Sequence, residues 1–238
     1  MRKIILAAFC FCIASFANAQ KFEISTQLYG GLFSFNGNSQ GVSNTTIVYD
    51  NSSYGLGVYS AKPYGKTPGT SIGVGAQFTF VTKSNVLFAF NTGYDNLGST
   101  TNINEVREEG VILNIYPATG KTKHRSQYIN IIPQIGYRIN AGEIKVDLMA
   151  GFNIAQCLDT KEKLNAKTQT RTYTAENKTT HPKTDPRPEL GFTVHYKKFG
   201  FISSYQWGVK NYYGLYIGGT KPEAFTRFLK LGLSYRIF

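Results

Sequence analysis

The 238-residue sequence has few cysteines, few charges and only one long apolar run. Two of its three cysteines lie within the first twelve residues and only Cys157 follows them, so the rest of the chain cannot contain an internal disulfide. Charged residues make up 17% of the sequence, below the roughly 25% of an ordinary soluble domain. Each membrane-spanning helix needs about 20 apolar residues, so the lack of a second apolar run excludes a multi-helix membrane protein.

The one apolar run, at the amino terminus, has the features of a secretory signal peptide. Arg2 and Lys3 precede an apolar core over 4–16, and Ala17-Asn18-Ala19 matches an A-x-A cleavage site. We therefore predict a signal peptide over 1–19 and a mature chain over 20–238. Its removal lowers the net charge from +12 to +10. The remaining cations are scattered, which disfavours nucleic acid as a partner and favours attraction to anionic glycolipid.

Eight segments of about ten residues alternate between apolar and small or polar side chains, which is the period of a β-strand. They cover residues 22–32, 71–80, 86–95, 129–138, 144–154, 189–196, 199–209 and 229–237. Short polar connections at 83–85, 140–142 and 197–198 alternate with long ones at about 34–69, 99–125, 156–186 and 210–225. Short turns on one rim and long extracellular loops on the other are typical of an outer-membrane barrel.

Alternation alone fits either a soluble sandwich or a barrel in lipid. The export signal, the aromatic residues near segment ends and the glycine-rich polar faces favour lipid. We predict an all-β fold: an eight-stranded antiparallel up-and-down transmembrane β-barrel after the signal peptide, with apolar residues facing lipid. Eight charges are expected to balance one another in the interior: Glu23, Asp95, Asp147, Glu189, Arg138, Lys145, Lys230 and Arg236.

The ANAQ cleavage region, the eight segments and the terminal LGLSYRIF resemble the small outer-membrane β-barrel proteins of Gram-negative bacteria. The chain is similar in particular to the Bacteroidota outer membrane protein beta-barrel domain class, which includes PorT-like proteins, and OmpA and OmpX share the architecture. The resemblance implies an outer-membrane location with periplasmic termini, contact with lipid and lipopolysaccharide, and recognition of the C-terminal strand by the barrel-assembly machinery. The sequence departs from the family pattern because its apolar phase ends at Ile237, one residue before Phe238.

No group of residues predicts catalysis, a cofactor or a metal site. His124 and His181 lie in long polar connections and are expected to be solvated, whereas His195 is expected to be a satisfied interior side chain. None is spaced with a serine and an acid on the outward face, as a lipid A-modifying enzyme would require. Three scattered histidines are a weak metal-binding set, and Gly120-Lys121-Thr122 lacks the first glycine of a P-loop.

One long connection is rich in cations, which suggests either a solvated loop or a surface for glycolipid phosphate or a partner. The cations of this connection, at 156–186, are Lys161, Lys163, Lys167, Arg171, Lys178 and Lys183. The favoured function is a non-enzymatic outer-membrane barrel with a structural or surface-interaction role through its long external loops, for an external partner that the sequence does not identify. The alternatives are an accessory subunit of a secretion or envelope-assembly machine, as in PorT-like proteins, a lipid A-modifying enzyme and a narrow channel.

Overall fold

The computed structural model describes residues 19–38, 43–51, 55–109, 113–178, 182–213 and 222–238, and the regular structure in them is β-strand. These ranges contain no helix long and apolar enough to cross a membrane. The predicted signal peptide lies outside the described residues except for Ala19, where the first strand begins.

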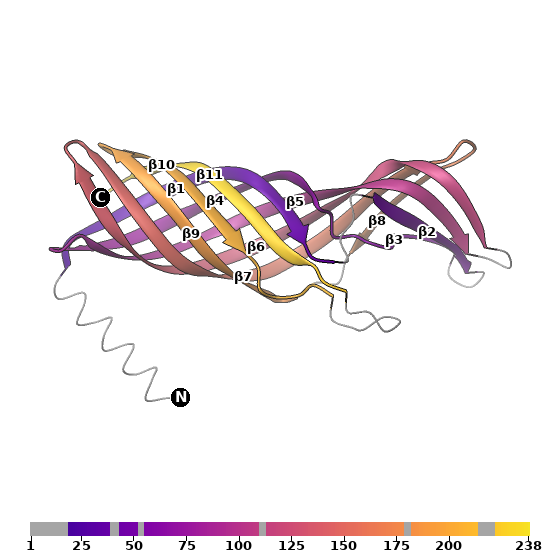
Figure 1. Ribbon diagram of the computed structural model, residues 1–238, viewed down its shortest axis with the longest axis horizontal. Coiled ribbons are helices and arrows are strands. Elements are labelled where there is room, and N and C mark those ends of the chain that lie inside the picture. Colours follow the sequence, from indigo (N-terminus) through magenta and orange to yellow (C-terminus); the bar gives the residue numbers. More distant parts are fainter. Residues whose placement is uncertain (1–18, 39–42, 52–54, 110–112, 179–181, 214–221) are drawn as a thin grey trace, which may run out of the picture.

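Eight long strands each pair with two neighbours and close into an antiparallel ring (Figure 1). In order they are β1 (Ala19–Asn36), β4 (Thr67–Thr82), β5 (Val86–Glu109), β6 (Asn114–Ala141), β7 (Ile144–Lys167), β9 (Thr184–Tyr196), β10 (Phe199–Trp207) and β11 (Phe225–Arg236). β11 pairs back with β1, so the ring leaves no open edge. The predicted eight-stranded up-and-down barrel is confirmed, and each predicted segment overlaps one of these strands.

Three tight turns close the hairpins β4–β5, β6–β7 and β9–β10 at one rim, as predicted. Asn85, Gly142 and Lys197 have φ angles of 63°, 64° and 54°, the left-handed values that tight hairpin turns favour. The carboxyl terminus lies at the same rim (Figure 1), where the Ile24 N–H donates to the Phe238 carbonyl at 2.9 Å. The start of β1 pairs with the end of β4 there as well.

The outer surface of the ring is apolar, and we call it the apolar belt. Its exposed members include Leu28, Ile72, Phe90, Ile129, Ile131, Ile135, Leu148, Phe152, Ile154, Leu158, Leu190, Phe201 and Leu231. Leu148 is 47% exposed, whereas its chain neighbour Asp147 is 5% exposed. The apolar face therefore points outward and the polar face inward, which is the arrangement of a membrane-spanning barrel and the reverse of a soluble sandwich.

Charged side chains near the short-turn rim form one buried network. Arg138 donates two hydrogen bonds to Glu23 (3.0 and 2.9 Å) and two to Asp147 (2.6 and 2.7 Å). Arg236 lies 3.1 Å from Glu23, and His195 lies 3.1 Å from Asp147. Charges inside an apolar barrel are tolerated only when they are paired in this way.

The other charges predicted to point inward lie further along the barrel, with one exception. Lys230 lies 3.6 Å from Glu189, and Tyr29 donates a hydrogen bond to Asp95 at 2.7 Å. All the predicted inward charges are buried apart from Lys145, which is half-buried at the short-turn rim. Its place at the start of β7 explains the difference, because the rim leaves its ammonium group access to solvent.

A layer of aromatic and charged side chains that the sequence did not predict fills the barrel toward the other end. Arg187 is fully buried, and its guanidinium carbon lies 4.4 Å from the Tyr128 ring centre and 5.8 Å from that of Phe33. It donates to Asp185 at 2.7 Å. Tyr212, from the β10–β11 connection, donates to Asp185 at 2.9 Å, and its hydroxyl lies 2.7 Å from that of Tyr128. These contacts block a wide passage through the described part of the barrel.

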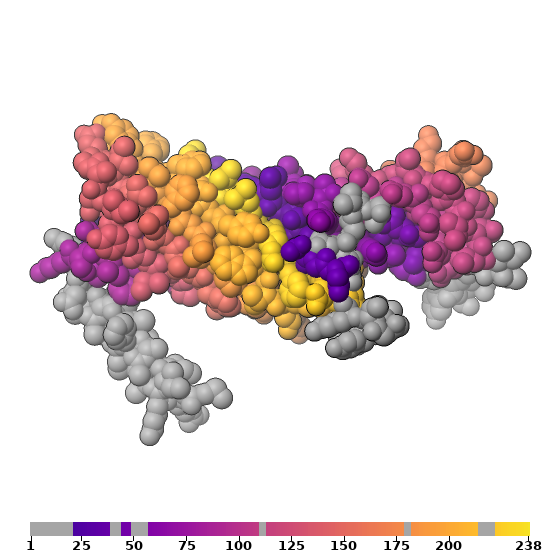
Figure 2. Space-filling model, in the orientation of Figure 1, coloured from indigo at the N-terminus to yellow at the C-terminus, as the bar shows by residue number. Residues whose placement is uncertain are grey.

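Three strands of the ring continue beyond the belt, where three further strands join the same sheet (Figures 1 and 2). Here β5, β6 and β7 are joined by β2 (Ser43–Asn51), β3 (Gly55–Ser60) and β8 (Thr172–Lys178), in the order β3-β2-β5-β6-β7-β8. The Asn177 side chain of β8 donates to the Val58 carbonyl of β3 at 2.8 Å, so the two edges meet. We call this six-stranded unit the extension.

The extension has the opposite sidedness to the barrel. Its inner face holds an apolar core of Val48, Val58, Ile103, Val106, Ala118, Leu164, Ala166, Tyr173 and Ala175. Its outer face carries lysines and other polar residues. The same strands β5 to β7 are thus apolar outside in the ring and apolar inside in the extension, as lipid around one part and water around the other would require.

The connections predicted as long loops are largely strand, which corrects that prediction. Segment 34–69 contains β2 and β3, segment 99–125 is mostly the paired ends of β5 and β6, and segment 156–186 contains β8 and parts of β7 and β9. The apolar side chains of these strands point inward, whereas those of the predicted segments point outward. The pattern that identifies the belt strands is therefore absent from these strands. In segment 210–225, residues 214–221 lie outside the described residues.

Candidate functional site: a cationic face on the extension

A grid of cations lies on the outer face of the extension, where alternate residues of adjacent strands point the same way. It consists of Lys121, Lys123 and Arg125 on β6, Lys161 and Lys163 on β7, and Lys178 on β8, all exposed. Lys123 pairs directly with Lys163. In the next row Lys161 lies between Arg125 and Lys178. We call these six residues the cationic face.

Sheet stability alone does not account for this grid, because like charges directly opposite one another destabilise a strand pair. Glu176 lies 3.0 Å from Lys163, and Asp159 lies 3.9 Å from Lys161. Both pairs are substantially exposed, so each contributes at most about 1 kcal/mol. In the described ranges, the other members of the cationic face make no ion pair. The face therefore keeps a positive charge that is available to an anion.

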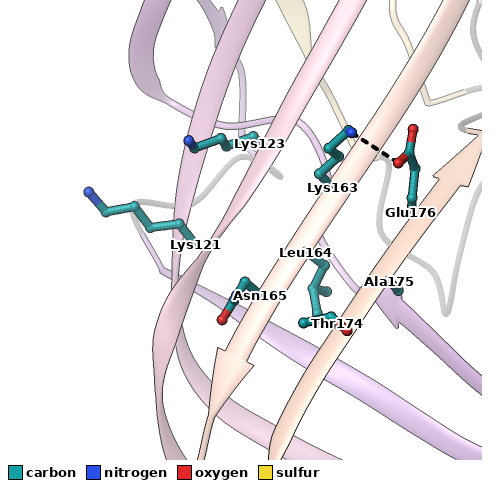
Figure 3. A pocket seen from close by; sticks show the side chains of 8 residues that line it. All are labelled: Lys121, Lys123, Lys163, Leu164, Asn165, Thr174, Ala175 and Glu176. Carbon is teal, nitrogen blue, oxygen red and sulfur yellow. Dashed lines mark ion pairs between the residues drawn. The ribbon is translucent and has the colours of Figure 1, made fainter.

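Two depressions hollow the cationic face. The larger, of about 510 Å³, is lined by Lys121, Lys123, Lys163, Leu164, Asn165, Thr174, Ala175 and Glu176. The smaller, of about 130 Å³, is lined by Asn96, Lys123, Arg125, Gln127, Asp159, Lys161 and Lys163. Figure 3 shows Lys121 and Lys123 extending at one side of the larger depression and the Lys163–Glu176 pair at the other. Ammonium and guanidinium donors on open surfaces suit exposed anionic groups such as phosphates.

The cationic face begins directly above the apolar belt. On β6 the outward series runs from Ile131 and Ile129 through Gln127 to Arg125 without a change of phase. Arg125 is four steps along the chain from Ile129, so the first cation lies roughly 13 Å along the strand from the last apolar side chain. On β7 Leu158 continues the outward phase of Ile154, and a register shift directly after it turns Lys161 and Lys163 outward.

The sequence identified one half of the cationic face. Lys161, Lys163 and Lys178 belong to the predicted cationic segment, whereas the β6 cations fell in a different predicted loop. Their spacing of two residues was the signal that could have placed them on one face of a strand. The other predicted cations lie elsewhere: Lys167 at the end of β7, Arg171 at 3.6 Å from Glu108, and Lys183 exposed before β9.

His124 is buried, which corrects the prediction of a solvated loop histidine. It is 1% exposed, because residue 124 has the inward phase on β6. Its Nε2 lies 3.0 Å from the Ser126 hydroxyl, and the rings of Phe35 and Tyr64 contact it edge to face at 5.5 and 5.4 Å. His195 lies inside the barrel beside Asp147, as predicted, and His181 falls outside the described residues.

A serine, a histidine and an acid share the inner face: Ser126 lies beside His124, and the strand register pairs the backbone of Glu162 with that of His124. All three are buried, so this arrangement has no surface on which a substrate could bind. In the described part of the chain, no group of three or more His, Cys, Asp or Glu side chains could hold a metal ion. Cys157 is a free, buried thiol.

Glu162 gives the extension a pH-dependent stability. Burial raises the pKa of its carboxyl group from 4.5 to about 7, and hydrogen bonds with Ser60 offset this only in part. A carboxyl group whose pKa is higher in the folded state than in the unfolded state destabilises the fold as pH rises from about 4.5 to 7. We expect Glu162→Gln to stabilise the chain at pH 8, on the order of 2 kcal/mol relative to its effect at pH 4.

Urea unfolding of the detergent-folded chain at pH 4 and pH 8 measures this difference. The matched control is Glu176→Gln, since that carboxylate is exposed on the adjacent strand and its removal should change both midpoints little. An equal response of the two variants to pH would contradict a special role for Glu162.

Comparisons with known proteins give only a weak similarity. No family model matches the chain, and no curated protein matches it. Among solved structures, it is similar to Ail, the attachment invasion locus protein of Yersinia pestis, determined in complex with the heparin analogue sucrose octasulfate. The identity is 11% and the TM-score 0.32, over 91% of this chain and 97% of that chain. A similarity of this size assigns neither a family nor a ligand to the chain.

Proposed function

We propose that the chain is a non-enzymatic outer-membrane β-barrel protein that holds its extension outside the cell for surface interaction. The observation that carries the proposal is the reversal of sidedness along β5, β6 and β7. An apolar belt around a closed ring suits lipid, because strands that pair around the whole ring leave no open edge of unpaired backbone groups. A polar exterior around an apolar core suits water, so one molecule presents a surface to each medium.

In the orientation that we propose, the short-turn rim and the two ends of the mature chain face the periplasm. The extension then lies on the cell-surface side. The C-terminal strand β11, followed by Ile237 and Phe238, would be the segment recognised by the barrel-assembly machinery. Both residues are exposed at 56% and 70%, which leaves an aromatic side chain available at the end of the chain.

Electrophoresis in detergent, with and without boiling, tests the proposal on membrane fractions. A closed barrel resists unfolding by detergent at room temperature, so we expect the unboiled protein to migrate differently from the boiled protein and to fractionate with the outer membrane. A chain that stays in the soluble periplasmic fraction, with one mobility in both samples, would contradict the proposal.

The interior of the barrel supports a role without catalysis or conduction. The Ser126, His124 and Glu162 side chains face inward and are buried, which removes them from a lipid substrate outside the barrel. Arg187 and the aromatic side chains around it fill the barrel toward the extension. We therefore expect unchanged lipid A in a strain that lacks the protein, and no steady conductance in planar bilayers.

The second candidate is an accessory subunit of a secretion or envelope-assembly machine. One observation favours it: Leu113, Ile115 and Tyr116 are exposed at 55%, 52% and 39% near the start of β6, far from the belt. Apolar side chains in water are a common feature of protein contacts. Co-purification of a stable multiprotein complex would favour this candidate, and a solitary monomer would favour the first.

A further inference from the structure

We propose that the cationic face binds the phosphate groups of a glycolipid in the leaflet that surrounds the barrel. This inference rests on the proposed function, because it needs the belt to lie in the outer membrane with the extension outside. The partner is defined by its chemistry: a sugar headgroup that carries phosphates and is attached to acyl chains.

The first argument is depth. Arg125 lies roughly 13 Å along β6 from Ile129, and a strand tilted by about 45° converts this into roughly 9 Å along the membrane normal. The headgroup region occupies roughly 5–8 Å on each side of the hydrocarbon core. The row that contains Arg125, Lys161 and Lys178 therefore lies at the outer limit of this region, where flexible cationic side chains can reach headgroup phosphates.

The second argument is the spacing of the donors. Neighbouring strands are about 4.8 Å apart, so this row presents three cations over roughly 10 Å. A phosphate accepts hydrogen bonds from several donors at once, and a guanidinium group can bind it through two. Bound phosphates would also relieve the repulsion between directly opposed cations such as Lys123 and Lys163.

The third argument concerns the source of the phosphate. The exposed side chains of Ile129, Ile154 and Leu158 lie directly below the charged rows on the same outer face. One lipid molecule can therefore contact cations with its headgroup and the apolar belt with its acyl chains. A soluble anion gains only the first contact, so the continuity of the two surfaces favours a membrane lipid.

The binding experiment uses the full mature chain folded in detergent micelles and titrated with diphosphorylated lipid A. We expect saturable binding that weakens with salt, and weaker binding of the same lipid after phosphatase treatment. Replacing Lys123, Arg125 and Lys163 together by glutamine should reduce the affinity about tenfold, because each exposed cation contributes a modest share. Inorganic pyrophosphate at the same concentration should not displace the lipid.

The matched control replaces Lys66, Lys83 and Lys198, three exposed lysines outside the cationic face, by glutamine, which makes the same change in net charge. Equal losses in the two triple variants would overturn the proposal, as would equal binding of the dephosphorylated lipid or displacement by pyrophosphate. The lipid comparison needs only the unmodified chain, so it decides the question even if the variant fails to fold. A heat-modifiable outer-membrane chain without phosphate preference refutes this inference alone, whereas a soluble chain refutes the proposed function.

Discussion

Replacing Arg138 by methionine is expected to destabilise the folded chain by about 3–5 kcal/mol. The guanidinium group donates four hydrogen bonds to Glu23 and Asp147, and all three side chains are nearly inaccessible to solvent. Methionine fills much of the same volume but leaves two buried carboxylates: Glu23 keeps its pairs with Arg236 and Lys21, and Asp147 keeps its contact with His195. The free energy of unfolding from urea titrations in detergent measures the loss.

Two further variants separate the charge effect from the loss of packing. Glu23→Gln and Asp147→Asn, introduced into the Arg138→Met chain, should recover part of the stability because they remove the uncompensated charges. Arg107→Met is the exposed control: its ion pair with Glu105 spans 3.4 Å between partly exposed side chains, and its loss should cost less than about 1 kcal/mol. Equal destabilisation by the two arginine substitutions would contradict the buried network as the cause.

Replacing Ile135 by arginine is expected to destabilise the barrel in lipid by about 2–4 kcal/mol, the cost of a cation at the centre of a bilayer. Ile135 is 54% exposed and lies near the middle of the outward apolar series of β6, which runs from Ile129 to Ile139. Its environment would be acyl chains. Unfolding titrations in phospholipid vesicles measure the cost.

The same strand provides the control. Ile115 is 52% exposed and also belongs to β6, but it lies in the extension. Ile115→Arg makes the same chemical change at nearly the same exposure, and we expect an effect close to zero because water already surrounds that side chain. Similar costs at the two positions would mean that the belt and the extension share one solvent, which is incompatible with a membrane around the belt.

The barrel could be predicted from the sequence because its outward residues carry a strong periodic signal. Every outward position of β6 from 129 to 139 carries an apolar side chain, including Pro133 between Ile131 and Ile135, because lipid selects apolar side chains there. The inward positions of the same segment, such as Arg138, gave the location of the charges. The sequence could not predict which charges pair with one another. Arg138 binds Asp147, 9 residues away in the chain, and Glu23, 115 residues away, and only the closed barrel brings all three together.

The extension escaped prediction for a physical reason. Its core residues Ile103, Val106 and Leu164 point inward and are flanked in the chain by Asn, Glu, Arg and Lys. The outward side chains of these segments are therefore polar, and the sequence lacks the outward apolar pattern that identifies a membrane-spanning strand. The sequence predicts a solvated His124 for the same reason, because the polar residues around it, among them Lys123 and Arg125, make the segment resemble a loop. Only the closure of the sheet around that inner face, which depends on contacts between β3 and β8, shows these residues to be buried.

The length of β6 determines how far above the membrane surface the exposed end of the extension lies. About 15 residues separate Asn114 from Ile129, which corresponds to roughly 50 Å of strand and roughly 35 Å of height at a 45° inclination. In the proposed orientation, Ile115 and Tyr116 would therefore project well above the sugars nearest the bilayer. A large partner protein could then contact these two side chains without reaching the sugars closest to the membrane. The paired strands below would hold this contact site at a fixed height above the bilayer.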